Sequence, residues 1–440
     1  MNFENLLGKI SEILRIYPKL WIIAIKLYGI RNLDINKLKF EKKTLVFPKN
    51  NSKNTNYNIF FDAQCLQNLT RQRGIGRYSL NLIKSICREN PNSKFAAFLT
   101  PICDEENLQN AYNCLVQLNC KNLDIFIIDF FGSKNKLSYR ESEIKLREFL
   151  ESRKCKTVIQ LSCFEKPNTV VPIQRSSFFK KIGMLYDLIP LEFPKELLIS
   201  RRQKTSYMWQ LREMSNCNLL FSISNESKTK WNKYVKVPIP IEVIYGGAPE
   251  HDLTSHKGFA ERNGILCIGA EQRHKNIKKL INAYAILPIE LQLQHPLTII
   301  GIRSIGARKH LIKMSKRALG RIVFLSYLRE NDLNLLLENN RVLVMPSLIE
   351  GLSLPILEAW SHGLVAIGGL DTVAEEIIVN KKLLFDPKNF NSISLCISKF
   401  LLDQIEWEEA LEFSKERSNL FTWNLTANRA LKFLNTMESA

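Results

Sequence analysis

The stretch VLVMPSLIEGLSLPILEAWSHG, residues 342–363, decides the fold. It joins a short apolar run, VLVMPS at 342–347, to a segment in which Ser353 and Pro355 mark a helix start and Gly363 marks its stop. A buried strand followed directly by a helix is the repeating unit of a parallel sheet with crossover helices. We therefore predict an α/β protein and look for the same unit elsewhere in the chain.

Similar apolar runs recur from residue 58 onward and fall into two groups. The first group is NIFFDA (58–63), FAAFLT (95–100), DIFIID (124–129), TVIQL (157–161), IGMLYDLI (182–189) and LLFSIS (219–224). The second group is ILCIGA (265–270), LTIIG (297–301), IVFLS (322–326), VLVMPS (342–347), LVAIGG (364–369) and KLLF (382–385). Residues 245–258 between them are polar and aperiodic, which indicates a linker. The pattern predicts two doubly wound, Rossmann-like domains facing one another across a cleft.

The composition is that of an ordinary packed chain of two or three domains, with 440 residues, 45% hydrophobic and 24% charged. The 62 Lys and Arg exceed the 43 Asp and Glu by 19, a charge that attracts nucleic acids, phosphorylated ligands or anionic membranes. No RNA-binding signature accompanies this charge, so we do not expect a nucleic-acid partner. The ten cysteines form no C-x-x-C pair, which argues against a zinc site and favours a reducing cytosol.

The N-terminal extension, residues 1–57, carries a helical stripe of Leu and Ile with Lys and Arg interspersed. Two interpretations stay open: a basic amphipathic segment on an anionic membrane surface, or a helix packed on its own protein. No apolar run reaches the length of a membrane span, and no cleavage site follows the apolar residues. We therefore predict neither a membrane span nor a secretion signal.

The helix start within 342–363 predicts an anion site. Residues 351–354 would present free backbone N–H groups at the positive end of the helix. Glu350 stands just before this helix and Glu358 near its first turn. Carboxylates beside such a helix end are suited to accept hydrogen bonds from sugar hydroxyls.

Five motifs in order resemble the family 4 retaining glycosyltransferases, which have the GT-B fold. They are RGIGRY (73–78), YDLIPL (186–191), GAEQRHKN (269–276), the P-S-x-x-E-G-x-x-L-P-x-x-E-A-x-x-x-G pattern from Pro346 to Gly363, and FTWNLTA (421–427). The resemblance runs from about residue 58 to 435, so it covers nearly the whole chain except the extension. It implies a first, acceptor-side domain over 58–245, a linker over 246–262, a nucleotide-sugar-binding domain over 263–405, and C-terminal helices over 406–440 that cross back to the first domain.

The resemblance also implies roles for individual residues. A nucleoside diphosphate sugar would bind mainly to the second domain, with the acceptor hydroxyl approaching from the first. Lys275 corresponds to the lysine that contacts the donor diphosphate, Glu350 to the glutamate near the donor sugar, and Glu358 to the glutamate that binds the ribose. The remaining donor-binding candidates are Gly74, Gly76, Arg273, Gly351, Leu352, Ser353 and Leu354. Arg73 and Arg77 are candidates for further phosphate contacts, although a solvated helix position is our favoured interpretation of Arg77.

Several positions depart from the family pattern. Tyr186 stands where a histidine is common, so the role of that histidine does not transfer directly, although Tyr186 and Asp187 stay catalytic candidates with Lys275 and Glu350. His274 replaces an arginine, and we expect Arg273 to supply the missing charge. Ser326 replaces a glycine, and Glu376 takes the place of a family glutamate but follows Glu375 instead of proline; the base is left open.

The resemblance implies a metal-independent, retaining transfer without a cofactor, and the chain has no D-x-D sequence at a strand end. Our leading hypothesis is a cytoplasmic hexosyltransferase, with mannose among the candidate sugars and a lipid-linked or polysaccharide acceptor. Attachment to the inner membrane face is an option for such an enzyme. The alternative is a catalytically degenerate GT-B module that binds glycan, nucleotide or membrane without turnover.

Overall fold

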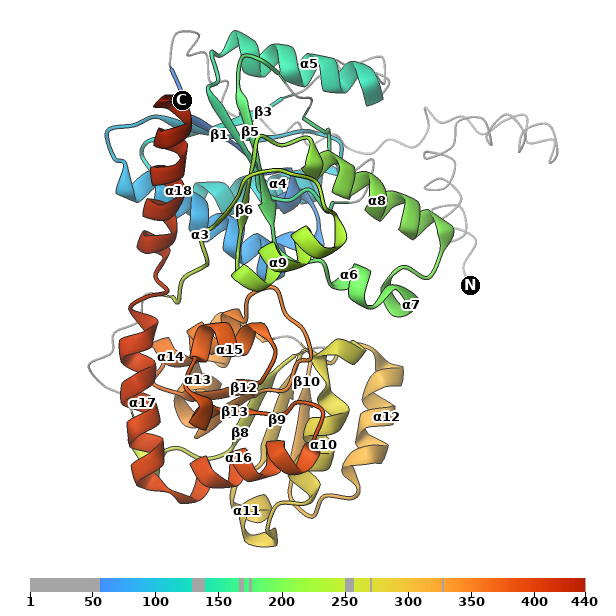
Figure 1. The fold of residues 1–440 in the computed structure, drawn as a ribbon, viewed down its shortest axis with the longest axis vertical. Coiled ribbons are helices and arrows are strands. Elements are labelled where there is room, and N and C mark those ends of the chain that lie inside the picture. The colour runs from blue at the N-terminus through green and yellow to red at the C-terminus, as the bar shows by residue number, and fades with distance from the viewer. Residues whose placement is uncertain are drawn as a thin grey trace, which may run out of the picture. The chain divides into compact units, whose positions relative to one another are not determined.

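Two parallel β-sheets organise the chain (Figure 1). The computed structural model describes residues 56–128, 139–165, 170–173, 176–249, 257–269, 271–326 and 328–439. Both sheets belong to the unit that spans residues 50–440. The helix predicted in the N-terminal extension lies outside the described residues, and so do residues 250–256 of the predicted linker.

The first sheet contains, within the described residues, seven parallel strands in the order β3-β2-β1-β4-β5-β6-β7. The strands are β1 (Ile59–Asp62), β2 (Phe95–Leu99), β3 (Leu123–Ile127), β4 (Thr157–Gln160), β5 (Lys180–Leu185), β6 (Leu219–Ser222) and β7 (Ile241–Val243). Most of their residues are buried because helices cover both faces of the sheet.

The second sheet has six parallel strands among the residues described, in the order β10-β9-β8-β11-β12-β13. They are β8 (Ile265–Ile268), β9 (Leu297–Ile300), β10 (Ile322–Leu325), β11 (Val342–Met345), β12 (Val365–Gly369) and β13 (Leu384–Phe385). This order is the doubly wound one, and the prediction of two Rossmann-like α/β domains is confirmed.

Every apolar run that we predicted as a strand overlaps one, and one further strand was missed. Strand β7 is three residues long and lies at the edge of the first sheet, paired with β6. Pro238 and Pro240 precede it, and prolines next to a short apolar run favour an irregular segment. An edge position tolerates them because only one side of the strand needs hydrogen bonds.

Helices connect the strands of each sheet. Those of the first domain are η2 (Gln64–Gln67), η3 (Leu69–Gln72), α3 (Gly74–Glu89), α4 (Glu105–Val116), α5 (Tyr139–Ser152), α6 (Ile189–Glu192), α7 (Pro194–Leu197), α8 (Arg201–Ser215) and α9 (Asn225–Tyr234). Those that follow are η4 (Phe259–Glu261), η5 (Arg273–Lys275), α10 (Ile277–Ala285), α11 (Ile289–Gln294), α12 (Ile305–Ser315), α13 (Glu330–Asn339), α14 (Leu354–Ser361), α15 (Val373–Ile378), η6 (Lys381–Leu383), α16 (Phe390–Leu402), α17 (Gln404–Ser418) and α18 (Trp423–Ser439).

The C-terminal crossing begins later than we predicted. Helix α17 packs on α14 and α16 of the second domain, where buried Trp407 donates a hydrogen bond from Nε1 to the Arg341 carbonyl at 2.8 Å. Only then does α18 pack along α3 of the first domain (Figure 1). The predicted crossing over 406–440 is therefore corrected to α18, because burial of Trp407 ties α17 to the second domain.

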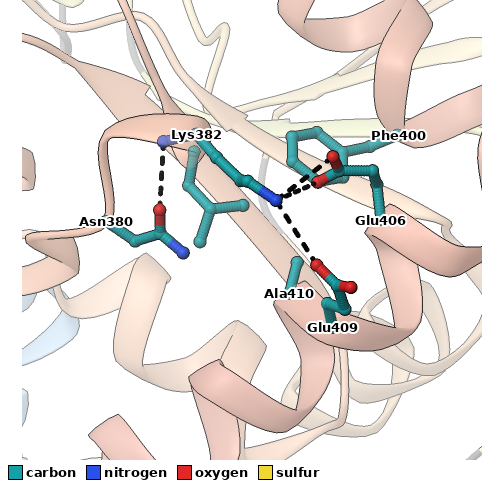
Figure 2. A pocket seen from close by; sticks show the side chains of 7 residues that line it. Asn380, Lys382, Phe400, Glu406, Glu409 and Ala410 are labelled. Atoms are coloured by element: carbon teal, nitrogen blue, oxygen red, sulfur yellow. Dashed lines mark hydrogen bonds and ion pairs between the residues drawn. The ribbon is translucent and has the colours of Figure 1, made fainter.

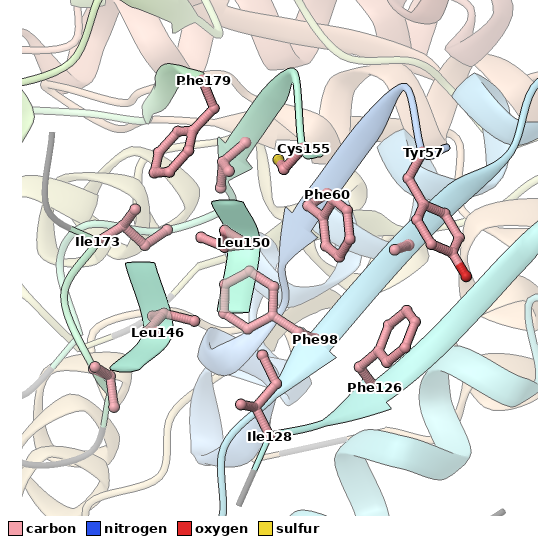
Figure 3. Close-up of a cluster of buried hydrophobic side chains, with 13 residues drawn as sticks. Tyr57, Phe60, Phe98, Phe126, Ile128, Leu146, Leu150, Cys155, Ile173 and Phe179 are labelled. Carbon is pink, nitrogen blue, oxygen red and sulfur yellow. The ribbon is translucent and has the colours of Figure 1, made fainter. Parts of the chain in front are cut away.

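An aromatic cluster forms the core on one face of the first sheet (Figure 3). Phe60 stacks on Phe126 with 6.1 Å between ring centroids, and Tyr57 meets both rings edge-on. Phe98 from β2 is completely buried in the same cluster. Each buried ring of this kind contributes about 1.5–3 kcal/mol by leaving water. The cluster fixes the strands whose carboxyl ends carry the polar groups described below.

Asp62 ends β1 and is buried at the carboxyl edge of the sheet. Its Oδ1 accepts hydrogen bonds from the backbone and side-chain nitrogens of Gln64, at 3.2 and 3.0 Å. Burial raises the pKa of Asp62 to about 7, against the lowering effects of Gln64 and Lys181. Near pH 7 this buried carboxyl group is therefore protonated in a large fraction of molecules, whereas an ordinary aspartate is fully ionised.

Replacing Phe98 by alanine should lower the free energy of unfolding by roughly 3–5 kcal/mol, because it leaves a cavity in the aromatic cluster. Phe178→Ala is the matched control, since the Phe178 side chain is 73% exposed. Urea unfolding followed by circular dichroism measures both variants. Equal losses of stability would contradict the proposed core.

The pKa of Asp62 predicts a specific pH dependence. A carboxyl whose pKa rises on folding, from 3.8 to about 7, stabilises the fold below pH 3.8 and loses that contribution as the pH rises through about 7. Asp62→Asn should therefore be more stable than the parent by roughly 2–4 kcal/mol at pH 8, with a gain that shrinks towards pH 4. Urea titrations across this range test the prediction, with exposed Asp371→Asn as the control; a gain independent of pH would refute it.

Candidate functional site

The strand order of the second sheet reverses at β8 and β11, which are direct neighbours. In open parallel sheets a ligand crevice forms at this point, beyond the carboxyl ends of the strands. Turn η5 follows β8, and residues 346–353 follow β11 and lead into α14. The segments that the sequence singled out are therefore brought together by the strand pairing.

Lys275 and Glu350 meet at this point. The Lys275 Nζ donates to both carboxylate oxygens of Glu350 at 2.7 Å, and Ser347 Oγ donates to Oε1 at 2.7 Å. The two side chains are 21% and 12% exposed, so both can be reached from solvent. Asn276 holds the lysine turn in place: it adopts the left-handed conformation (φ 58°), and its Nδ2 donates to the Pro346 carbonyl at 2.9 Å.

Asp187 of the first domain belongs to the same electrostatic environment. Its Oδ1 accepts from the Ile189 N–H at 3.1 Å. Burial raises the pKa of Asp187; Lys275 lowers it and Glu350 raises it further. The structure thus brings together three of the predicted catalytic residues, from both domains.

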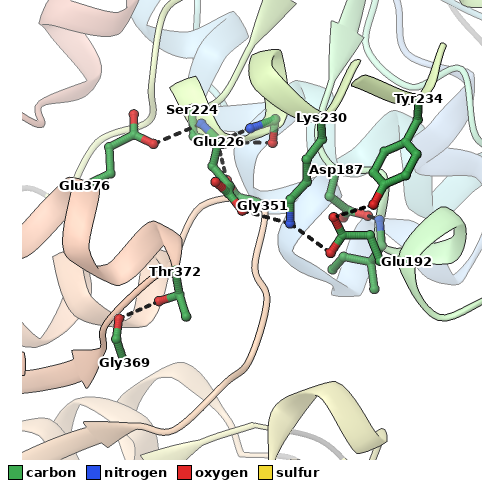
Figure 4. Close-up of polar contacts among 12 residues, drawn as sticks. Asp187, Glu192, Ser224, Glu226, Lys230, Tyr234, Gly351, Gly369, Thr372 and Glu376 are labelled. Atoms are coloured by element: carbon green, nitrogen blue, oxygen red, sulfur yellow. Dashed lines mark hydrogen bonds and ion pairs between the residues drawn. The ribbon is translucent and has the colours of Figure 1, made fainter. Parts of the chain in front are cut away.

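Gly351 lies in close contact with the first domain (Figure 4). Its carbonyl accepts a hydrogen bond from Ser224 Oγ at 2.6 Å. A Cβ at position 351 would lie 2.6 Å from the Tyr186 carbonyl oxygen, so the contact requires glycine. This glycine therefore has a steric function in joining the domains, besides its predicted place in the donor site.

Tyr186 is buried in the first domain. Its hydroxyl donates to the Leu161 carbonyl at 2.8 Å and lies 3.1 Å from Ser79 Oγ. Its ring meets Tyr78 edge-on, with 5.5 Å between centroids. The hydroxyl is thus already engaged inside the domain, and a contact from it to a donor sugar stays a prediction.

Helix α14 begins at Leu354, with Ser353 as its N-cap and Pro355 in its first turn. The Ser353 Oγ is buried, and among the described residues it has no hydrogen-bond partner. Leu352 is also buried and packs close to Gly246 of the interdomain segment. A buried hydroxyl without a partner at the positive end of a helix is suited to an anionic ligand.

Glu358 lies on α14 and is buried, but its partner was not expected. Arg77 of α3, in the first domain, forms an ion pair with its carboxylate. Burial raises the pKa of Glu358, and Arg77 opposes this effect. Arg77 lies on α3 and its side chain is 48% exposed, as expected for a solvated helix position. Its ion pair with Glu358 across the domain interface was not predicted.

The other residues of turn η5 differ in character. The Arg273 guanidinium is mostly exposed and pairs with Glu196 of α7 at 2.9 Å. His274 is buried near Phe193, and burial lowers its pKa to about 4, so it is neutral at pH 7. Lys275 is therefore the cation of this turn that points at Glu350, and the predicted compensating role of Arg273 stays a prediction.

The glycine-rich loop lies at the start of α3. A Cβ at Gly76 would collide with the backbone of Arg71, so the loop requires glycine there, whereas Gly74 has open space around it.

Glu165, which the sequence analysis missed, holds the turn that precedes this loop. Its Oε2 accepts hydrogen bonds from Asn68 Nδ2 at 2.6 Å and from Thr70 Oγ1 at 3.1 Å. Its position shortly after the apolar run 157–161 was the available signal.

Glu376 of α15 is a second residue whose contacts the sequence did not reveal (Figure 4). Its carboxylate accepts from the backbone N–H groups of Asn225 and Glu226, at 2.8 and 3.0 Å, and from the Tyr245 hydroxyl at 2.9 Å. It thus caps the N-terminus of α9 from the opposite domain. We noted Glu376 only as a family position.

A separate cavity of about 240 Å³ lies on the second domain and is lined by residues of η6, α16 and α17 (Figure 2). Its cation, Lys382, is bonded to Glu406 at 3.2 Å and to Glu409 at 3.4 Å. Because two carboxylates already neutralise this lysine, the cavity is poorly suited to a diphosphate.

The comparisons with known proteins agree with this geometry. Residues 252–418 match the sequence model of the family described as glycosyl transferases group 1. This part of the chain is similar to the group 1 glycosyl transferases. The site around Lys275, Glu350 and α14 lies within the matched residues, so the family resemblance is confirmed for the group 1 domain.

Two mannosyltransferases of Escherichia coli are similar to the chain. The serotype-specific mannosyltransferase WbdA is 24% identical over 404 residues, which cover 85% of this chain and 47% of WbdA. The O-antigen chain mannosyltransferase B is 33% identical over 160 residues, or 36% of this chain and 42% of that protein. The chain spans about half the length of the curated relatives that it matches.

A solved structure extends the similarity beyond the group 1 domain. HepE of Anabaena, in complex with UDP-glucose, aligns with a TM-score of 0.62 at 14% identity. The alignment covers 86% of this chain and 99% of HepE. At this identity the similarity concerns the fold, and the predicted GT-B architecture is confirmed.

Two further properties concern the described ranges alone. Within them, no group of three or more His, Cys, Asp or Glu side chains is arranged to hold a metal ion. Nor does any helix in this part of the chain combine the length and the hydropathy that crossing a bilayer demands. Independence from metals and cofactors stays a prediction.

The contacts of Glu376 predict a variant that loosens the domain interface. Glu376→Ala removes an anionic cap from α9 and should lower stability by about 1–2 kcal/mol. Thermal unfolding and small-angle X-ray scattering would show a lower Tm and a larger radius of gyration. Glu375→Ala is the matched control, because Glu375 bonds to the Asp371 N–H of its own domain. Identical behaviour of the two variants would count against the interdomain cap.

Proposed function

We propose that this protein transfers a hexose from a nucleoside diphosphate sugar to a hydroxyl of a lipid-linked or polysaccharide acceptor in cell-surface glycan synthesis. The observation that carries the proposal is the Lys275–Glu350 pair beside the N-terminus of α14 in a group 1 domain. Mannose is the proposed sugar because the similar E. coli proteins are named mannosyltransferases. The complex of HepE with UDP-glucose supports a nucleoside diphosphate sugar as the donor class.

The donor diphosphate would bind between Lys275 and the start of α14. The lysine supplies a full positive charge, and the N–H groups of Leu352 and Ser353 lie at the positive end of the helix. The Leu354 N–H, which we predicted to be free, donates to the Leu352 carbonyl at 2.8 Å. The unpartnered Ser353 hydroxyl offers a further donor. Such groups act where charge develops as the nucleoside diphosphate departs, which lowers the barrier to transfer.

The two glutamates would bind the hydroxyl groups of the donor. Glu350 can accept from the sugar once the diphosphate draws Lys275 away from its carboxylate. Glu358 can accept from the ribose, with Arg77 either displaced or turned towards a phosphate. Because each carboxylate already has a cationic partner, donor binding is an exchange of charged partners rather than the filling of an empty site.

We propose a retaining, metal-independent reaction by front-face attack. The bond from the anomeric carbon to the phosphate oxygen breaks, and the acceptor oxygen bonds to that carbon on the same face. The acceptor proton passes to the departing phosphate oxygen, so no separate general base is needed. Asp187 and Tyr186 would then position groups around the reacting sugar.

A catalytically degenerate GT-B module is the second candidate. It is favoured by two observations: the Tyr186 hydroxyl is engaged with the Leu161 carbonyl, and His274 is neutral where the family has an arginine. Such a module would bind nucleotide, glycan or membrane without turnover. For either candidate we propose a cytoplasmic location with peripheral attachment at the inner membrane face, where a lipid-linked acceptor would be presented.

Nucleotide release from GDP-mannose and UDP-glucose, with a glycan acceptor, tests the proposal. Lys275→Ala should reduce kcat/KM by roughly 100-fold or more, because the leaving group loses its cation. Lys278→Ala is the matched control: Lys278 is exposed on the same segment and should leave the rate close to that of the parent. Thermal shifts with each nucleotide sugar measure binding independently. Binding without release by the parent would favour the degenerate module, and neither binding nor release would overturn the proposed transferase.

A further inference from the structure

Helix α12 and its flanking residues begin next to the candidate site, because Glu271 of segment 269–276 accepts hydrogen bonds from the backbone N–H groups of Arg303 and Ser304, at 2.9 and 3.3 Å. Residues 303–321 form an unusually basic surface on the second domain. They contain seven Lys and Arg and no Asp or Glu. The basic residues are Arg303, Arg308, Lys309, Lys313, Lys316, Arg317 and Arg321, and all of them are exposed. Within the described residues none of these side chains forms an ion pair with a carboxylate, so their positive charge faces the solvent.

Helix α12 gives this surface two distinct faces. The helix is capped by Ser304, whose Oγ accepts from the Ala307 N–H at 3.2 Å. Its inner face packs on α10 through buried Leu311, with Ala307 and Met314 half-buried on the same side. The helix is therefore held by a narrow apolar stripe, and the rest of its circumference is left to solvent (Figure 1).

The outer face combines aliphatic side chains with the cations. Ile305 is 76% exposed and Ile312 is 43% exposed, and two helical turns separate them on one face. Leu319, in the turn after the helix, is 67% exposed. Lys309, Lys313 and other cations flank this aliphatic row. An apolar row bordered by lysine and arginine is the pattern of a helix that lies in a membrane interface.

We propose that α12 and its flanking residues 303–321 are the surface through which the protein docks on an anionic lipid bilayer. Phosphate headgroups would attract the seven cations, while Ile305, Ile312 and Leu319 enter the boundary between headgroups and acyl chains. Nucleic acid is a poorer match, because a phosphate backbone offers nothing to bury exposed aliphatic side chains. The choice of a membrane as the partner rests on the proposed function. The test measures binding to vesicles and does not depend on catalytic activity.

Co-sedimentation of the full chain with vesicles tests the proposal. The parent should bind vesicles that contain phosphatidylglycerol, bind vesicles of phosphatidylcholine alone much more weakly, and lose binding as salt is raised. The variant K309E/K313E/K316E should bind roughly tenfold more weakly or worse. The matched control K94E/K121E/K388E changes the net charge equally at exposed sites elsewhere and should bind more tightly than the α12 variant.

A second variant separates a bilayer from other polyanions. I305S/I312S keeps every charge and should still weaken vesicle binding several-fold, because it removes the aliphatic side chains that enter the interface. Binding of the I305S/I312S variant to duplex DNA should equal that of the parent. If both α12 variants bind vesicles as tightly as the parent, another segment docks the protein and the proposal is overturned. A preference of the parent for DNA over vesicles would also overturn it. Nucleotide release without vesicles should equal that of the parent, which keeps this test distinct from that of the proposed function.

Discussion

The ion pair between Lys275 and Glu350 depends on one constraint, the direct pairing of β8 with β11. Parallel neighbours end at the same edge of a sheet, so the residues that follow them are forced together although 75 positions separate them. The carboxylate fixes the ammonium group, and Ser347 fixes the carboxylate. The field of this pair reaches Asp187, and the adjoining Gly351 touches the first domain. The group 1 domain thus organises the interface as well as its own site.

Several polar contacts join the two domains. Arg77 meets Glu358, Arg273 meets Glu196, Glu376 caps α9, and Ser224 bonds to Gly351. Hydrogen bonds and partly exposed ion pairs can be exchanged for water at modest cost, whereas an apolar interface of similar size cannot. Such an interface suits a protein whose substrate has to enter between the domains. It also explains why the charged side chains proposed to bind the donor already have partners.

The sequence predicted those features of the fold and site that depend on local pattern. Each apolar run became part of a strand, and Ser353 and Pro355 marked the start of α14 correctly. Both features could be predicted because the spacing of apolar residues and helix capping depend on residues that are close in the sequence. Strand β7 was missed because three residues directly after two prolines carry too little pattern. The partners of Glu376 and Arg77 could not be foreseen, because they come from the opposite domain and depend on how two complete sheets dock.

The connection between the domains has a mechanical consequence. The chain crosses twice at adjacent points, where Ala248 pairs with Thr422 in a parallel bridge and its N–H donates to the Phe421 carbonyl at 2.8 Å. Two interdomain segments that are joined at one point form a pivot between the domains. Rotation of the two domains about this point would keep the bridge intact, whereas sliding of one domain along the other would break its hydrogen bond. Each closure of the two domains would therefore bring the same facing residues back into contact.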